Sequence, residues 1–236
     1  MKTAVIGKAM PSEGVARLVR AGYSVLVLPS HPHLNGPVAD HPDTLLFSHA
    51  NTLIISAAYA DVARDILLTL QKQQDIHLLI DPVDLSSPYP QDVRLNAKVV
   101  GHCLFGRLPS LSDTLLSYAG RAGLSLCDTA QGYAACTALA FDGYLVSSDP
   151  SMLATAQKNG IKGLAIREGG ILLPPDPYGF IGGATAVTED TVYTCGDLLS
   201  HPDGERIKNL LSATGRRIFP LFEGPLLDVG GILFFE

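Results

Sequence analysis

The chain ends with Asp228-Val229-Gly230-Gly231-Ile232-Leu233-Phe234-Phe235-Glu236, a glycine-rich turn followed by one apolar strand that has no helix of its own. At the other end, residues 3–7 are typical of a strand, Pro11-Ser12-Glu13-Gly14 of a helix start, and residues 23–29 of a second buried strand. Each end therefore holds an incomplete unit. Placing the last strand beside the first two completes one unit of strand, strand, helix and strand.

The same order of elements recurs between the two ends. The units start near His41, Gln91, Gln131, Gly179 and Val229, at spacings of 40 to 50 residues. Repeats of this length indicate units that bury their apolar faces only against their neighbours. We therefore predict one α/β domain, residues 1–236, built as a five-bladed α/β propeller with pseudo-fivefold symmetry and closed by pairing of the N- and C-terminal strands. The alternative is an ordinary doubly wound sheet.

The remaining elements follow from apolar periodicity and helix-start residues. The expected strands are 44–47, 52–55, 76–80, 97–105, 124–127, 134–140, 144–147, 164–166, 184–187, 191–195 and 217–221. One expected helix spans 57–73, and the others follow Ser110-Leu111-Ser112-Asp113, Ser148-Asp149-Pro150-Ser151 and Ser200-His201-Pro202-Asp203.

Composition restricts the class of protein and its partners. Apolar residues make up 47% of the chain and charged residues 17%, which favours a large core with fully buried strands. No apolar run reaches the roughly 18 residues that span a bilayer, and residues 1–7 already form a strand, so we expect a soluble, cytoplasmic protein. The net charge of −6, with scattered Lys and Arg, argues against nucleic acid. We expect a small-molecule ligand and no membrane partner; an oligomer is possible but not indicated.

The cysteines and histidines give no metal or disulfide pattern. The four cysteines, Cys103, Cys127, Cys136 and Cys195, are far apart, so free thiols are expected. The seven histidines lack the paired spacing of common metal sites. The segment from Gly7 to Gly14 opens a helix after a strand but lacks the phosphate-binding glycine pattern. We therefore predict neither a metal nor another cofactor.

Five units of this order, with a Gly-Gly strand at the end, resemble the pentein fold of guanidino-group-modifying enzymes such as arginine deiminase, dimethylarginine hydrolase and the amidinotransferases. Several short segments of the chain also resemble, more narrowly, an uncharacterised bacterial family of that fold. The segments that carry this second resemblance are 39–44 (Ala-Asp-His-Pro-Asp-Thr), 131–136 (Gln-Gly-Tyr-Ala-Ala-Cys), 178–184 (Tyr-Gly-Phe-Ile-Gly-Gly-Ala), 200–203 (Ser-His-Pro-Asp) and 227–231 (Leu-Asp-Val-Gly-Gly).

The resemblance implies a chemistry whose parts can be sought in this chain. In those enzymes a cysteine attacks the guanidinium carbon, a histidine moves protons, and carboxylates hold the planar cation. The position matching the nucleophile is about Phe234, and the stretch matching the histidine begins at Gln131. The Glu-Gly-Gly type turn of the second unit has become roughly Asn96-Ala97-Lys98. We therefore expect the standard Cys/His machinery to be missing, with no thiol and imidazole together at the centre.

The acidic patch of the first unit is better matched, by Asp40 and Asp43. We predict a central site for a small polar or cationic ligand, guanidino or amino-acid-like. Its expected residues are Asp40, Asp43, Gln131, Tyr133, Asp228, Gly182, Gly183, Gly230 and Gly231. The glycines are expected where the backbone has positive φ or approaches closely.

Two alternatives remain at this point. An amidino hydrolase or amidinotransferase could use a relocated nucleophile, Cys136, near His41 or His201, although a cysteine inside an apolar strand is more often a buried core residue. For His201 we expect instead that it or Ser200 precedes a helix whose first turn holds Pro202, Asp203 and Glu205. A non-catalytic interaction scaffold is the other alternative, but no basic or apolar face supports it.

Overall fold

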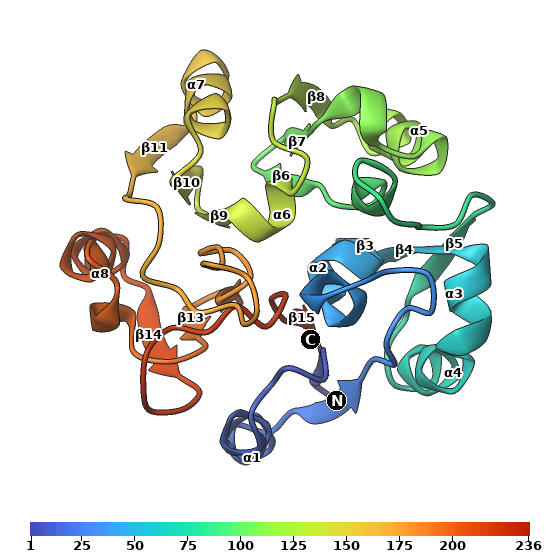
Figure 1. Cartoon of the computed structure of the whole chain (residues 1–236), viewed down its shortest axis with the longest axis horizontal. Coiled ribbons are helices and arrows are strands. Elements are labelled where there is room, and N and C mark those ends of the chain that lie inside the picture. Colours follow the sequence, from blue (N-terminus) through green and yellow to red (C-terminus); the bar gives the residue numbers. More distant parts are fainter.

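The computed structural model describes residues 1–236, and its strands form five separate three-stranded sheets. All five sheets have the same topology: the first strand is antiparallel to the second, and the second is parallel to the third. The helices between the parallel strands lie at the periphery in Figure 1. This is an α/β fold of small mixed sheets, and it excludes the single sheet of a doubly wound protein.

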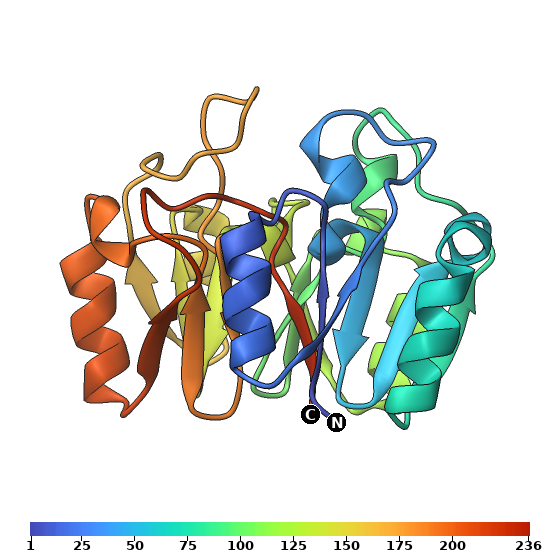
Figure 2. The ribbon, with the colours of Figure 1, turned by 90° about the horizontal axis from the view of Figure 1, so that it is seen from below.

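One sheet joins the two ends of the chain. It contains β1 (Thr3–Ile6), β2 (Ser24–Val27) and β15 (Leu233–Phe235), with helix α1 (Ser12–Arg20) between β1 and β2. Strand β15 runs antiparallel to β1, with Ala4 opposite Phe234. Figure 2 shows the two termini side by side at one end of the molecule.

The other four sheets follow in chain order. The second has β3 (Leu46–His49), β4 (Thr52–Ser56), α3 (Ala57–Val62), α4 (Arg64–Gln73) and β5 (His77–Asp81). The third has β6 (Lys98–Val100), β7 (Cys103–Gly106), α5 (Asp113–Arg121) and β8 (Ser125–Asp128). The fourth has β9 (Ala138–Phe141), β10 (Tyr144–Ser147), α7 (Pro150–Lys158) and β11 (Lys162–Ala165). The fifth has β12 (Thr185–Val187), β13 (Thr191–Thr194), α8 (Gly204–Ala213) and β14 (Arg217–Pro220).

Side-chain caps fix two of the predicted helix starts. The Ser112 hydroxyl accepts the Leu115 N–H at 3.1 Å before α5, and the Asp149 carboxylate accepts the Met152 N–H at 2.9 Å before α7. These bonds satisfy N–H groups that the first helical turn leaves unpaired. The predicted helix 57–73 is interrupted at Ala63, between α3 and α4.

The predicted start of the last helix is wrong by several residues. A 3₁₀ turn at Leu198–Ser200 comes first, and α8 begins only at Gly204, with Asp203 before it. His201 instead accepts the Asp203 N–H on its Nδ1 atom, and of the expected first-turn residues only Glu205 lies in the helix. The Asp197 carboxylate, which accepts the Leu199 N–H, takes the capping role at the 3₁₀ turn.

Two segments predicted as strands begin with a helical turn. Residues Pro42–Leu45 form α2 before β3, and Ala134–Thr137 form α6 before β9. The His41 carbonyl accepts two N–H groups of α2, and the Tyr133 carbonyl accepts the Thr137 N–H. An apolar run of this length does not distinguish a strand from a buried helical turn, which is why the sequence was misleading here.

The core follows the inner and middle strands of the sheets. Strands β4, β7 and β13 are completely buried, whereas β8 and β14 at the outside are largely exposed. Figure 1 places α2 and α6 toward the middle of the molecule. No helix has the length and apolar character required to cross a bilayer. All residues of α2 and α6, the turns that precede β3 and β9, are buried.

Candidate functional site

Hydrogen bonds link the five sheets in a ring around this centre. The Asp43 N–H donates to the Gly230 carbonyl, the Gly231 N–H to the Gly183 carbonyl, and the Gly183 N–H to the Cys136 carbonyl. The side chain of Asn96 completes the ring: its Oδ1 accepts the Ala135 N–H at 2.7 Å and its Nδ2 donates to Thr44 Oγ1 at 3.3 Å. Each link joins segments that precede the first strands of neighbouring sheets.

The centre of this ring holds an imidazole, a carboxylate and a thiol. One ligand atom from each of His41, Asp43 and Cys136 lies within 4.8 Å of the other two. The His41 Nδ1 atom is 4.0 Å from Asp43 Oδ1 and 3.8 Å from Asp228 Oδ1. The three clustered side chains are 2%, 8% and 2% exposed, respectively. We call His41, Asp43 and Cys136 the central cluster.

Two glycines allow the backbone to close around the cluster. A Cβ atom on Gly183 would lie 1.9 Å from Asp228 Oδ1, and one on Gly230 would lie 2.4 Å from His41 Cα. Gly230 also has φ of 76°, a conformation that glycine adopts at little cost. The predicted need for close approach and positive φ is met at these positions.

Asp228 lies beside His41 of the cluster and is almost completely buried. Its Oδ2 accepts the Phe180 N–H and its Oδ1 accepts the Gly230 N–H, both at 2.9 Å. Burial raises the pKa of Asp228 to about 6; His41 opposes this shift and the charge of Asp43 adds to it. No Lys or Arg pairs with this carboxylate.

Cys136 is held in its thiol form. Burial, followed by the charges of Asp43 and Asp228, raises the pKa of Cys136 well above its usual value. The Asn96 Nδ2 donates to Cys136 Sγ at 3.1 Å and acts in the opposite direction. Because the thiolate is the reactive form, the thiol is not activated for attack in this arrangement.

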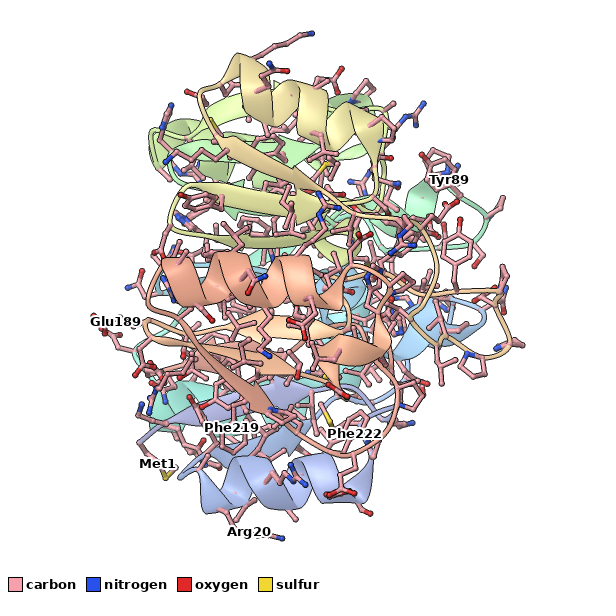
Figure 3. The ribbon with its side chains drawn as sticks, turned by 90° about the vertical axis from the view of Figure 1, so that its left-hand side faces the viewer. Met1, Arg20, Tyr89, Glu189, Phe219 and Phe222 are labelled. Atoms are coloured by element: carbon pink, nitrogen blue, oxygen red, sulfur yellow. The ribbon has the colours of Figure 1, made fainter.

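One cavity opens above the cluster, on the side of the long loops. Its volume is about 290 Å³, and we call it the loop-side cavity. It is lined by Val38, His41, Tyr133, Cys136, Leu173, Asp176, Pro177, Tyr178, Phe180 and Asp228. The lining thus combines two carboxylates and three aromatic rings with no Lys or Arg. Figure 3 shows Tyr89, whose ring is 5.9 Å from that of Tyr133, at the end of the molecule opposite Glu189.

More carboxylates surround the rim of the loop-side cavity. The Tyr133 hydroxyl donates to Asp92, and the Tyr178 hydroxyl donates to Glu168. Burial and the Asp92 carboxylate raise the pKa of Tyr133, so its ring stays neutral. Two tyrosines of the cavity lining are thus bonded to carboxylates.

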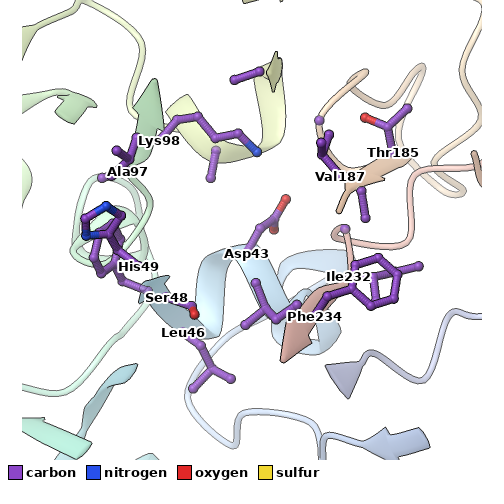
Figure 4. Close-up of a pocket in the computed structure, with 18 of the residues that line it drawn as sticks. Asp43, Leu46, Ser48, His49, Ala97, Lys98, Thr185, Val187, Ile232 and Phe234 are labelled. Atoms are coloured by element: carbon purple, nitrogen blue, oxygen red, sulfur yellow. The ribbon is translucent and has the colours of Figure 1, made fainter. Parts of the chain in front are cut away.

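A second cavity, of about 410 Å³, lies on the other side of the cluster (Figure 4) and is called the terminus-side cavity. Residues of β3, β6, β9, β12 and β15 line it together with Asp43, Gly182 and Gly231. Figure 4 shows the Lys98 side chain extending into this cavity above Asp43. Burial lowers the pKa of Lys98, whereas Asp43 and Cys136 raise it. The central cluster thus separates two cavities.

The structure does not bring all the predicted ligand residues to one place. Asp228 and Tyr133 line the loop-side cavity, whereas Asp40 and Gln131 lie outside both linings. Gln131 accepts the Tyr133 N–H and donates to Asp149, so its amide is already used within its own segment. His201 also lies outside both linings, beside Pro202 and Gly170.

The expectation that no thiol and imidazole meet at the centre is wrong. Cys136 lies in α6 and His41 directly precedes α2, two turns that lead into different sheets, and both side chains belong to the central cluster. Phe234, at the expected nucleophile position, instead packs against the rings of Tyr23 and Tyr193 at centroid distances of 4.8 and 4.9 Å.

Sequence reasoning missed several residues of the site. In the sequence, Asn96 stood out only because it lies where the resembled enzymes have a glycine-containing turn. In the structure, its side-chain amide forms hydrogen bonds with three neighbouring residues. Asp176, Tyr178 and Phe180 lie in a loop whose path over the cavity depends on long-range packing. The Tyr178-Gly179-Phe180 stretch beside Gly182-Gly183 was the one available hint.

The fold defines a structural class, the pentein fold, which several solved guanidino-group-modifying enzymes share. DDAH from Pseudomonas aeruginosa, solved with citrulline, has a TM-score of 0.54 at 12% identity, over 99% of this chain and 98% of that one. The inosamine-phosphate amidinotransferase of Streptomyces griseus has a TM-score of 0.58 at 13% identity, over 98% and 92%. The agmatine deiminase of C. jejuni has a TM-score of 0.54 at 10% identity, over 93% and 87%. At these identities the likeness establishes the fold alone.

Within that class, the chain belongs to the Family of unknown function (DUF6873), whose model matches residues 5–233. No curated protein matches the sequence. The activity of this chain must therefore be argued from its own residues.

Proposed function

We propose that this protein binds a small organic cation of the guanidino or amine class in the loop-side cavity and does not hydrolyse it. The observation that carries the proposal is the lining of the cavity: Asp176 at the rim, Asp228 at the floor and three aromatic rings, with no Lys or Arg. Carboxylates bind a planar cation through charge-assisted hydrogen bonds, and aromatic faces add a cation–π attraction. The cavity volume of about 290 Å³ suits a ligand of amino-acid size.

The absence of hydrolysis follows from the state of the thiol. Burial and two neighbouring carboxylates keep Cys136 protonated, so the group that attacks a guanidinium carbon in this class is not formed. The net charge of −6 supports a cationic small molecule, rather than nucleic acid, as the partner.

We further infer that the five sheets act as the blades of a closed, pseudo-fivefold propeller. The ring of hydrogen bonds through Asp43, Asn96, Cys136, Gly183 and Gly231 supports this interpretation, as does the pairing of β15 with β1. The site would then lie on the axis, where every blade contributes a segment.

Calorimetry with arginine, agmatine, a polyamine and citrulline tests the binding proposal. Citrulline has nearly the shape of arginine without its charge, so we expect it to bind at least on the order of tenfold more weakly, because it forms no charge-assisted bonds. The test variant is Asp176→Asn, which removes a rim charge from an exposed residue; about fivefold weaker agmatine binding is expected, the modest effect of an exposed ion pair.

The matched control is Asp61→Asn, which removes the same charge from an exposed residue on α3, outside both cavity linings. Its affinity for agmatine should equal that of the unmodified protein. Equal affinities for arginine and citrulline, or no binding of any compound in the panel, would refute the proposal.

A second candidate function is amidino hydrolysis or transfer by Cys136. The observation that favours it is the position of Cys136 and His41 together in the lining of the loop-side cavity. A bound cation would offset the negative charges of Asp43 and Asp228, which disfavour ionisation of Cys136, and so favour the Cys136 thiolate. Ammonia or urea release from agmatine or arginine, lost in Cys136→Ser, would establish this function in place of the first.

A further inference from the structure

The central cluster combines three side chains of metal-ligand type. An imidazole, a carboxylate and a thiol supply one nitrogen, one oxygen and one sulfur atom, all within 4.8 Å of one another. In a tetrahedral site with metal–ligand bonds of 2.0–2.3 Å, such atoms are roughly 3.3–3.6 Å apart. Metal binding would require these atoms to move closer than they now are; His41 Nδ1 and Asp43 Oδ1, for example, are 4.0 Å apart.

The free hydrogen-bonding capacity of the cluster also points to a ligand. His41 Nε2 and Asp43 Oδ2 are buried and have no hydrogen-bond partner. Both side chains are more than nine-tenths buried, so water does not replace the missing partners freely. A buried polar atom without a partner costs on the order of 1–3 kcal/mol, and two on adjacent side chains call for a common explanation.

We propose that His41, Asp43 and Cys136 bind a divalent transition ion of the Zn²⁺ class. Mixed nitrogen, oxygen and sulfur ligands suit this class, whereas Mg²⁺ and Ca²⁺ prefer oxygen alone. When the ion binds, the Cys136 Sγ–H bond breaks, the sulfur keeps the electron pair for the metal bond, and the proton leaves to solvent. Three protein ligands leave one position of a tetrahedral site open.

Neighbouring residues are placed to support such a site. The Asn96 Nδ2 donates to Cys136 Sγ, as a donor to a thiolate ligand would, and the Ala135 N–H holds this amide in place. Asp228 Oδ1 is 3.8 Å from His41 Nδ1, so this carboxylate lies next to the imidazole but does not hydrogen-bond to it. Lys98 lines the terminus-side cavity and not the loop-side cavity, and its charge interacts with Asp43 and Cys136.

This inference goes beyond the proposed function because it assigns a metal ion to the central cluster, of which His41 and Cys136 also line the loop-side cavity. Asp176 and the aromatic rings of the cavity take no part in metal binding, and the organic cation does not need the thiol. Agmatine calorimetry in the presence of a chelator therefore tests the proposed function alone.

The test is a Co²⁺ titration of the full chain, reduced and freed of metal by a chelator. The expected result is one Co²⁺ per chain with a strong near-ultraviolet thiolate-to-Co²⁺ absorption band, which Zn²⁺ removes by displacement. In Cys136→Ser the band should vanish and Zn²⁺ should bind at least about 100-fold more weakly, since a first ligand matters at least as much as an outer partner.

The control is Cys103→Ala, which removes a buried thiol of β7 outside the cluster and should keep the band. The unmodified protein decides the question even if Cys136→Ser does not fold. Co²⁺ that binds without a thiolate band, as it would on surface histidines, overturns the proposal, and so does a band that persists in folded Cys136→Ser.

Discussion

Asn96→Ala should be among the most destabilising single changes outside the hydrophobic core. The Asn96 side chain is completely buried and makes three hydrogen bonds, to Ala135, Thr44 and Cys136. Alanine leaves the buried Ala135 N–H without an acceptor, which costs about 1–3 kcal/mol, and removes two further bonds worth roughly 0.5–1.5 kcal/mol each. Because some of the lost bonds re-form, we expect the free energy of unfolding to fall by about 3 kcal/mol.

Urea unfolding followed by circular dichroism measures this change, and a thermal scan should show Tm lower by about 6–12 °C for a chain of this size. The control is Asn209→Ala, an exposed asparagine on α8 with no side-chain hydrogen bond, where alanine should be neutral or slightly stabilising. If Asn96→Ala is within about 0.5 kcal/mol of the unmodified protein, the range of ordinary surface changes, Asn96 does not complete the central ring.

Two further changes test particular contacts. Gly183→Ala places a methyl group 1.9 Å from Asp228 Oδ1, whose carboxylate is held by two N–H groups, so unfolding by urea should show a loss of about 2–3 kcal/mol. Gly120→Ala, with open space around the added atom, should show none. Asp203→Asn should destabilise the protein at pH 7, because the Arg167 N–H holds the pKa of Asp203 well below its usual value. A carboxyl pKa that is lower in the folded protein stabilises the fold at pH values above the pKa of the unfolded chain, which is about 4 for Asp. The difference in the free energy of unfolding between Asp203→Asn and the unmodified protein should therefore shrink as the pH falls below about 4. A difference independent of pH would show that the Asp203 charge is not responsible.

The fold could be predicted from the sequence because its signal is periodic. The order of strand, strand, helix and strand recurs along the chain, and the incomplete units at the two ends indicate that β15 joins β1. Helix starts were predictable where a short polar side chain caps the first turn, as at Ser112 and Asp149. At Ser200 and His201 the same residue types form a 3₁₀ turn and a local bond, so α8 starts later.

The site was predictable only in part, because it depends on contacts between units. Asp43 and Asp228 could be proposed from their position before a strand. That Cys136 meets His41 rather than His201 could not be decided, because the helical turns α2 and α6 that bring the two side chains together were predicted as strand. The position of Asp176 depends on a loop whose path is set by tertiary packing.

A crystal structure of the protein with agmatine would reveal whether the organic cation binds in the loop-side cavity. The account predicts the guanidinium group in the loop-side cavity, within hydrogen-bond distance of Asp228 or Asp176 and in contact with an aromatic ring. Agmatine bound elsewhere, for example against Asp43 in the terminus-side cavity, or absent from both cavities at saturating concentration, would contradict it.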